Sequence, residues 1–210
     1  MGRNINNKCR QCRAAGEKLM LRGERCSSPK CAMVKRNYAP GPHGQSKGRK
    51  RPSGYGLQLA EKQSAKVFYG LSEKQFRLTL EKASKKTGDA GKNFLRALEK
   101  RLDNVIYRLG FAVSRGQARQ LVNHGHFTVD AKKVDIPSFT VKAGQVIKIK
   151  PTSAANRYFK NLHESLKKAD CPSWLNLNVA ELSAKVLHEP KDEDLPQDIN
   201  VQTIIEYYSK

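Results

Sequence analysis

The sequence lacks long apolar runs and is poor in acidic side chains. Its uninterrupted hydrophobic stretches are only a few residues long, whereas a membrane-crossing helix needs about 20. No charged segment followed by an apolar one opens the chain, which argues against a secretory leader. The 210 residues, 38% of them hydrophobic, suffice for one large domain or two small ones with a buried core. We therefore expect a soluble, cytoplasmic protein.

Acidic residues are scarcest where basic residues are densest. The chain has 40 Lys and Arg against 19 Asp and Glu, a formal charge of +21, which predicts a polyanionic partner. Residues 1–52 hold 14 basic and 2 acidic side chains, a net +12, whereas residues 190–210 hold 2 and 5, a net −3. An anionic membrane surface would require a basic amphipathic helix, but Gly and Pro in residues 39–54 break helices. The pattern favours a nucleic acid and argues against a membrane.

Cysteine is also rare, and four of the five cysteines lie within the first 31 residues. Cys9 and Cys12, then Cys26 and Cys31, have the spacing C-x2-C, thirteen residues, C-x4-C, which is close to that of structural zinc sites. This segment has too few large apolar side chains to fold by burial alone, so a metal would supply the missing stability. Zinc is the expected metal, with an iron–sulfur cluster as the alternative. Disulfides would be reduced in the cytosol, and four unrelated thiols would be an improbable coincidence.

The rest of the chain predicts helices followed by a small sheet. Residues 58–69 and 73–86 have helical patterns, and apolar residues from 94 to 109 recur on one helical face before a glycine. Ser114 and Gln117 form a capping box for a helix that ends at Gly125. Alternating apolar residues between 127 and 149 predict antiparallel strands. The apolar end of the chain predicts a last helix that docks on residues 58–90.

Residues 102–150 combine a short arginine-bearing helix with a hairpin, an arrangement that can lie against folded RNA and read its backbone by shape. Arg115 and Arg119 are one turn apart, so both guanidinium groups can point the same way. We find no nucleophile paired with a base, and therefore expect neither an enzyme nor a small-molecule substrate.

We predict an α+β protein in three parts. Residues 1–45 form a metal-stapled basic arm held by the four cysteines. Residues 46–92 and 182–210 form a helical domain completed by the C-terminal tail. Residues 93–181 form an inserted RNA-binding domain of helices on a small antiparallel sheet.

Ordered landmarks over nearly the whole chain resemble the S-four family of bacterial small-subunit ribosomal proteins. They are the four cysteines and residues 39–44 (APGPHG), 61–63 (EKQ), 75–77 (QFR), 102–111 (LDNVIYRLGF), 114–119 (SRGQAR), 124–125 (HG) and 204–209 (IIEYYS). One departure is the turn at Asp130 and Ala131, where the family commonly has Asn-Gly before a basic residue.

The resemblance implies a structural constituent of the small ribosomal subunit that binds the 5′ domain of 16S rRNA directly and nucleates assembly. It also implies neighbouring small-subunit proteins as partners, a position near the channel through which mRNA enters, an influence on decoding accuracy and, in some bacteria, repression of its own mRNA. Charge, position and the resemblance together predict these RNA-binding residues: Arg3, Arg10, Arg13, His43, Lys47, Arg49, Lys50, Arg51, Tyr55, Arg77, Arg115, Arg119, His124 and His126.

Other interpretations stay open. Residues 47–51 would also suit a solvated tail, Arg115 and Arg119 would suit surface salt bridges, and Tyr55 would suit simple packing. An RNA-modifying enzyme with this RNA-binding domain would need a catalytic constellation that the remaining residues do not offer. A zinc-dependent DNA-binding regulator would prefer duplex DNA to structured rRNA.

Overall fold

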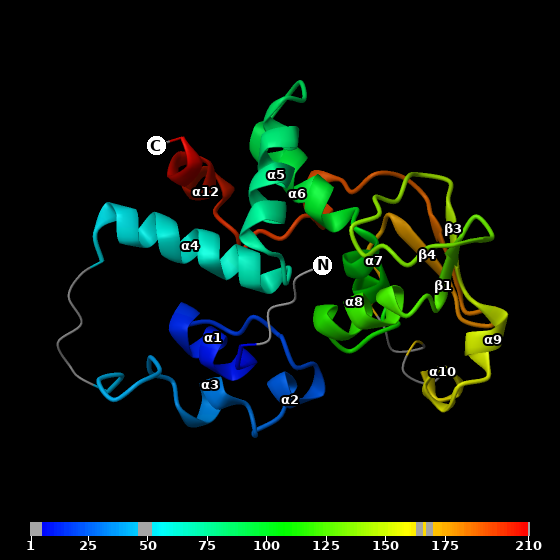
Figure 1. The fold of residues 1–210 in the computed structure, drawn as a ribbon, viewed down its shortest axis with the longest axis horizontal. Helices are drawn as coiled ribbons and strands as arrows, with labels where there is room; N and C mark the ends of the chain where they lie inside the picture. The colour runs from blue at the N-terminus through cyan, green and yellow to red at the C-terminus, as the bar shows by residue number, and fades with distance from the viewer. Residues whose placement is uncertain (1–5, 46–51, 163–165, 167–169, 210) are drawn as a thin grey trace. The chain divides into compact units, whose positions relative to one another are not determined.

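The computed structural model describes residues 6–45, 52–162, 166 and 170–209 (Figure 1). The chain divides into two compact units. Unit 1 consists of residues 1–91 and 196–210, and unit 2 of residues 92–195. None of the helices in these described ranges is long and apolar enough to cross a membrane.

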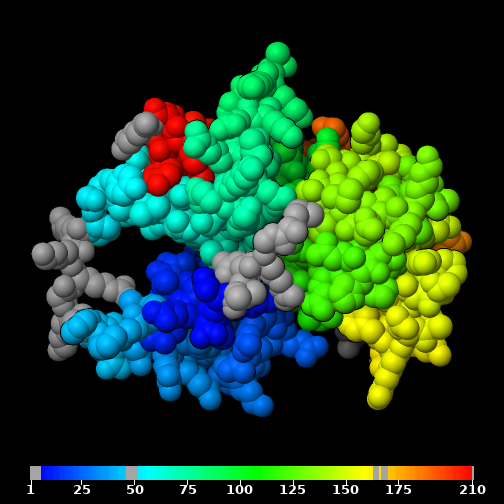
Figure 2. All heavy atoms as spheres, viewed as in Figure 1, coloured from blue at the N-terminus to red at the C-terminus, as the bar shows by residue number. Residues whose placement is uncertain are grey.

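Three short helices form the N-terminal arm of unit 1. They are α1 (Lys8–Ala15), α2 (Glu24–Ser27) and α3 (Ala32–Lys35). Gly16 ends α1 with φ of 83°, in the left-handed region that glycine adopts without strain. The arm buries little apolar surface, and Leu19 is its large buried side chain. Glu17 accepts a hydrogen bond from Ser64, which joins the arm to the long helix that follows. In Figure 2 the blue arm lies beside the cyan segment that contains this helix.

The remainder of unit 1 is a set of helices that the C-terminal helix completes. They are α4 (Gly54–Phe68), α5 (Glu73–Ser84) and α12 (Val201–Tyr208). Helix α4 starts earlier than residue 58 because the Ser53 side chain accepts a hydrogen bond from the backbone of Gly56 and caps it. Helix α12 packs on α4, where it buries Ile204 completely (Figure 1).

The first helices of unit 2 are α6 (Ala90–Glu99), whose first two residues still belong to unit 1, α7 (Leu102–Arg108) and α8 (Arg115–Asn123). The single helix expected over residues 94–109 is wrong, because Arg101 has the extended backbone of a helix cap and forms a bridge with Thr140. The cap at Ser114 is confirmed, since its side chain accepts a hydrogen bond from the backbone of Gln117. Gly125 follows α8 with φ of 69°.

Five antiparallel strands form the sheet of unit 2, in the order β2-β1-β3-β5-β4. They are β1 (Phe127–Val129), β2 (Lys132–Lys133), β3 (Val146–Ile149), β4 (Leu175–Asn178) and β5 (Ser183–Val186). The predicted boundary between residues 181 and 182 needs correction, because it separates β5 from a sheet in which β5 pairs with both β3 and β4. Burial of Ala184 and Val186 holds this short strand in the sheet.

The core of unit 2 lies between its helices and one face of the sheet. Phe111, Phe127, Phe159 and Trp174 are among its fully buried side chains. Within the polar helix expected over residues 154–169 the structure has α10 (Arg157–Lys160), preceded by α9 (Pro151–Ala154), and residues 163–165 and 167–169 of that prediction lie outside the described residues. A one-turn 3-10 helix, η1 (Asp192–Asp194), precedes the return of the chain to unit 1. The predicted α+β class, helices with a small antiparallel sheet, is confirmed.

Candidate nucleic-acid interface

The arm contains a cleft of about 800 Å³ that is lined by positive charge. Eight of its lining residues are Lys or Arg, and of the described residues that line it none is acidic. Such a concave cationic surface suits the closely spaced phosphates of a folded nucleic acid. The cations are Lys8, Arg10, Arg13, Arg22, Arg25, Lys30, Lys35 and Arg36.

Arg13 holds one wall of this cleft in place. Its Nε donates to the carbonyl oxygen of Tyr38 over 2.9 Å, and its Nη2 donates to that of Ala39 over 3.1 Å. Its guanidinium carbon also lies 4.6 Å from the centre of the Tyr38 ring, a cation–π geometry. The loop that follows is tight, since a side chain at Gly44 would collide with the carbonyl oxygen of Ala39. Arg13 is therefore both a predicted RNA-binding residue and a brace for the loop.

The four N-terminal cysteines surround a much smaller cavity of about 10 Å³, room for one water-sized occupant. Cys12, Cys26 and Cys31 are buried, and all four are free thiols. Burial raises the pKa of the Cys12 thiol, and the other three cysteines add to that effect. Five residues line both this cavity and the cationic cleft, so the two features share a wall: Lys8, Cys9, Arg22, Arg25 and Ala32.

The fit of a metal to the four thiols is incomplete in this structure. The donor set suits zinc, and the backbone of Arg22 donates to Cys26 Sγ over 3.3 Å, the kind of contact that steadies a thiolate ligand. Yet within the described ranges no group of three or more His, Cys, Asp or Glu is arranged to hold a metal ion. The metal-stapled arm therefore remains a prediction.

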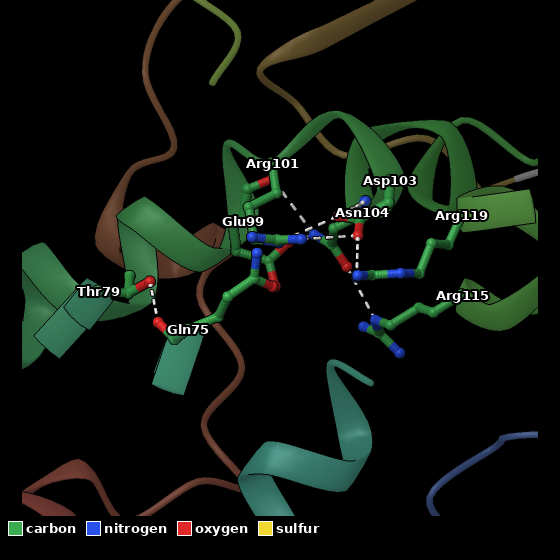
Figure 3. A network of polar contacts seen from close by, with 8 residues as sticks. All are labelled: Gln75, Thr79, Glu99, Arg101, Asp103, Asn104, Arg115 and Arg119. Carbon is green, nitrogen blue, oxygen red and sulfur yellow. Dashed lines mark hydrogen bonds and ion pairs between the residues drawn. The ribbon is translucent and has the colours of Figure 1, made fainter. Parts of the chain in front are cut away.

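Arg115 and Arg119, which the sequence predicted to bind RNA, are buried, with 9% and 8% of their surface exposed. Figure 3 shows both side chains extending from α8 towards Asp103 and Asn104. Arg115 Nε donates to Asn104 Oδ1 over 2.8 Å, and its guanidinium stacks 4.5 Å from the Tyr107 ring. Arg119 pairs with Asp103 Oδ2 at 3.3 Å. Both arginines thus tie α8 to α7, because burial demands a partner for each polar group.

The acceptors in this network were missed by sequence reasoning. Asp103 also forms a bidentate ion pair with Arg101, whose Nε and Nη2 donate to the two carboxylate oxygens over 3.1 and 2.8 Å. Asn104 donates to the buried Glu99 over 2.8 Å, and Glu99 in turn binds Arg108. The available signal was the polar pair Asp103 and Asn104 within an otherwise apolar helical stretch. Polar residues at such positions are buried only when they have partners.

The other predicted RNA-binding residues are dispersed over the two units. Arg10 lines the cleft, and His43 is exposed in the loop beyond it. Tyr55 is exposed at the start of α4 and packs at 5.6 Å against the ring of Tyr207. Arg77 forms a surface ion pair with Glu81. Five further predicted residues lie outside the described ones: Arg3, Lys47, Arg49, Lys50 and Arg51.

His124 and His126 follow α8 with their rings 6.0 Å apart. His124 is exposed, whereas His126 Nδ1 contacts Ser153 Oγ at 2.9 Å and its ring packs edge-on against Phe159. Burial lowers the pKa of His126, and the charges of His124 and Lys150 lower it further. The lowered pKa keeps the His126 ring uncharged at neutral pH, so this histidine adds no fixed positive charge at the end of α8.

Comparisons with known proteins agree with the resemblance seen in the sequence. Residues 3–99 match the family described as ribosomal protein S4/S9 N-terminal domain, and residues 100–147 match the S4 domain. The chain is 54% identical over its full length, and that of the relative, to small ribosomal subunit protein uS4 of Clostridioides difficile. It is 51% identical, again over both full lengths, to the protein of the same name from Thermus thermophilus. The chain therefore belongs to the uS4 family of small ribosomal subunit proteins.

Proposed function

We propose that the chain is a structural, non-catalytic constituent of the small ribosomal subunit that binds the 5′ domain of 16S rRNA directly. The single observation that carries this proposal is the cleft of the arm, whose eight cations face no lining acid among the described residues. The names of its full-length relatives agree with such a role. A role of this kind also locates the chain in the cytoplasm.

The cleft would bind RNA mainly through release of counterions from phosphates. A protein that makes 6–10 phosphate contacts loses roughly 10³–10⁵-fold in affinity between 50 and 200 mM salt. The eight cleft cations provide that many contacts without using the buried arginines of unit 2. We therefore expect steep salt dependence.

A salt titration of binding to a 5′-domain transcript tests this function. Arg10→Ala and Arg25→Ala should each weaken binding and reduce the slope of log K against log salt by about 1. Lys82→Ala, which removes an exposed cation of α5 outside the cleft, serves as the matched control and should retain the wild-type slope. Binding of the wild type that is insensitive to salt would refute the proposal.

The same proposal extends to assembly and translation. A direct rRNA binder would nucleate subunit assembly together with neighbouring small-subunit proteins, influence decoding accuracy near the channel through which mRNA enters, and repress translation of its own mRNA. Reconstitution of the subunit without this chain should then stall early. Competition between the 5′-domain transcript and the leader of its own mRNA for the purified protein tests the repressor role.

We also propose a metal in the arm. Cys9, Cys12, Cys26 and Cys31 would hold one zinc ion, with an iron–sulfur cluster as the alternative, since they line one cavity. Bound zinc would crosslink three short helices that bury little apolar surface. Elemental analysis together with an absorption spectrum distinguishes one equivalent of zinc from iron, and the absence of both from protein purified without chelators would refute the site.

A further inference from the structure

The four N-terminal cysteines differ in their access to solvent. All four lie among the described residues and line the small cavity, but Cys9 alone of them also lines the cationic cleft. Cys9 is partly exposed, whereas Cys12, Cys26 and Cys31 are buried. The cleft therefore gives a small dissolved molecule access to Cys9, while the other three thiols are shielded from solvent.

Positive charge surrounds Cys9. Lys8 and Arg10 are its neighbours on α1, and both line the cleft. Arg22 and Arg25 line the cleft and the small cavity together with Cys9. Reactive cysteines in proteins have such partly exposed, electropositive surroundings, whereas buried structural cysteines are inert. Cys9 is therefore the thiol of the arm that an oxidant should reach and attack first.

Cys12 is placed to complete an oxidation that begins at Cys9. It follows Cys9 by one turn of α1, so the two side chains lie on one side of that helix with about 5–6 Å between their Cβ atoms. Both residues also line the same small cavity. An accessible thiol beside a second thiol that can displace its oxidised form is typical of cysteines that sense oxidants.

We propose that Cys9 is an oxidation site, at which hydrogen peroxide converts Cys9 and Cys12 reversibly into a disulfide. The Cys9 thiolate attacks one peroxide oxygen, so that an S–O bond forms, the O–O bond breaks, hydroxide leaves and a sulfenic acid remains. The Cys12 thiol then attacks that sulfur, an S–S bond replaces the S–O bond, and the hydroxyl group leaves with the thiol proton as water. The peroxide has then taken two electrons from the two sulfurs, and a thiol reductant returns them. Since the cytosol keeps thiols reduced, the disulfide is transient.

The disulfide would change the cationic cleft. It holds the two Cβ atoms about 3.5–4.5 Å apart, closer than they lie one turn apart in a helix, so the first turn of α1 must shift. That turn carries Lys8 and Arg10, two of the cleft cations. The disulfide would also remove two of the four thiolates that the proposed metal needs. This effect on the cleft bears on RNA only through the proposed function, whereas the oxidation of Cys9 does not depend on it.

Disulfide mapping of the full chain tests the oxidation site. The wild type would be treated with hydrogen peroxide, its remaining thiols blocked, and its peptides identified by mass spectrometry without reduction. We expect a disulfide between Cys9 and Cys12 that dithiothreitol reverses, with Cys171 still reduced. Thiols that all stay reduced, or a disulfide between any other pair, would overturn the inference.

Two variants separate the two chemical steps. In Cys12→Ser the reaction should stop at the sulfenic acid of Cys9, which dimedone labels, and no disulfide should form. Cys171→Ala, which removes the cysteine of unit 2, is the matched control and should form the disulfide as the wild type does. Should Cys12→Ser fail to fold, the map of the wild type alone decides.

Binding to a 5′-domain transcript tests the effect on the cleft. We expect the oxidised wild type to bind about three- to tenfold more weakly than the reduced protein, the size of one or two weakened phosphate contacts. Dithiothreitol should restore the affinity, and Cys9→Ser should bind equally before and after peroxide. Equal affinities of the oxidised and reduced wild type would overturn the effect on the cleft. A reduced wild type that does not bind the transcript would overturn the proposed function, and the mapped disulfide would stand.

Discussion

Arg115 on α8 donates from Nε to Oδ1 of Asn104 on α7, over 2.8 Å, and both residues are buried. The amide nitrogen of Asn104 at the same time donates to Oε2 of Glu99 over 2.8 Å. One neutral side chain thus connects a buried guanidinium group to a buried carboxylate. Since charges in the interior persist only with hydrogen-bonded partners, Asn104 carries more of the stability of unit 2 than its size suggests.

Asn104→Ala should therefore destabilise unit 2 by about 2–4 kcal/mol, because it leaves Arg115 and Glu99 each short of a buried partner. Urea unfolding followed by the fluorescence of Trp174, the single tryptophan and a buried residue of unit 2, measures the loss. Asn176→Ala, at an exposed position of β4, is the control and should change the urea concentration at the unfolding midpoint little. Equal effects of the two substitutions would argue against the network as a stabilising unit.

The turn between β1 and β2 predicts a stabilising substitution. Asp130 and Ala131 both have positive φ, 49° and 65°, which is a strained conformation for alanine. Asp130 is held there because its carboxylate accepts from the backbone of Val146 and from Gln145, whereas the Ala131 side chain adds nothing comparable. Ala131→Gly should stabilise unit 2 by about 0.5–1 kcal/mol, the relief of strain exceeding the entropy cost of glycine.

The same Trp174 assay measures this gain. Ala143→Gly, in another exposed turn where the backbone φ is not positive, is the control and should be neutral or slightly destabilising. A loss of stability in Ala131→Gly would mean that the alanine makes contacts that outweigh its strain.

Features set by neighbouring residues could be predicted from the sequence. Ser114 caps α8 as expected, because a capping hydrogen bond joins residues that are three apart in the sequence. Gly125 follows α8 as expected, because a positive φ after a helix is a local preference of glycine. The apolar pattern of residues 201–208 similarly predicted a helix with a buried face.

Features that depend on distant partners could not be predicted. Arg115 and Arg119 are buried because Asn104 and Asp103 reach them from α7, and helical periodicity alone says nothing about that packing. Strand β5 has only four residues, and its place in the sheet comes from pairing with β3 and β4. The cationic cleft gathers residues from α1, α2, α3 and the loops between them, so charge density was visible in the sequence but its concave arrangement was not.

Acid should weaken the attachment of α12 to α5 within unit 1. Burial raises the pKa of Glu73, but hydrogen bonds from Lys62, Lys66 and Tyr208 outweigh it and lower that pKa from 4.5 to about 2. A carboxyl whose pKa is lower in the folded state contributes stability that is present above pH 4.5 and is lost as pH falls towards 2. Because the Glu73 side chain is 46% exposed, solvent screens these contacts and we expect a loss of about 1 kcal/mol.

Urea unfolding followed by circular dichroism between about pH 5 and pH 2 measures this dependence. The free energy of unfolding should fall with decreasing pH in the wild type, and Glu73→Gln should lose the part of this slope that the Glu73 carboxyl contributes. Glu81→Gln, which breaks a surface pair with Arg77 on the same helix, should keep the wild-type slope. An identical slope in Glu73→Gln and in the wild type would show that the Tyr208 contact adds nothing to the docking of α12.

Replacement of Arg13 by lysine separates the two roles of this residue in the cleft. Lysine keeps the positive charge but loses the forked hydrogen bonds to Tyr38 and Ala39 and most of the stacking on the Tyr38 ring. The loop 39–44 should then be less ordered, and affinity for the 5′-domain transcript should fall about three- to tenfold with no change in salt slope. Arg25→Lys conserves charge at a cleft position on α2 and should bind nearly as the wild type does. Equal affinities for Arg13→Lys and Arg25→Lys would mean that Arg13 acts through its charge alone.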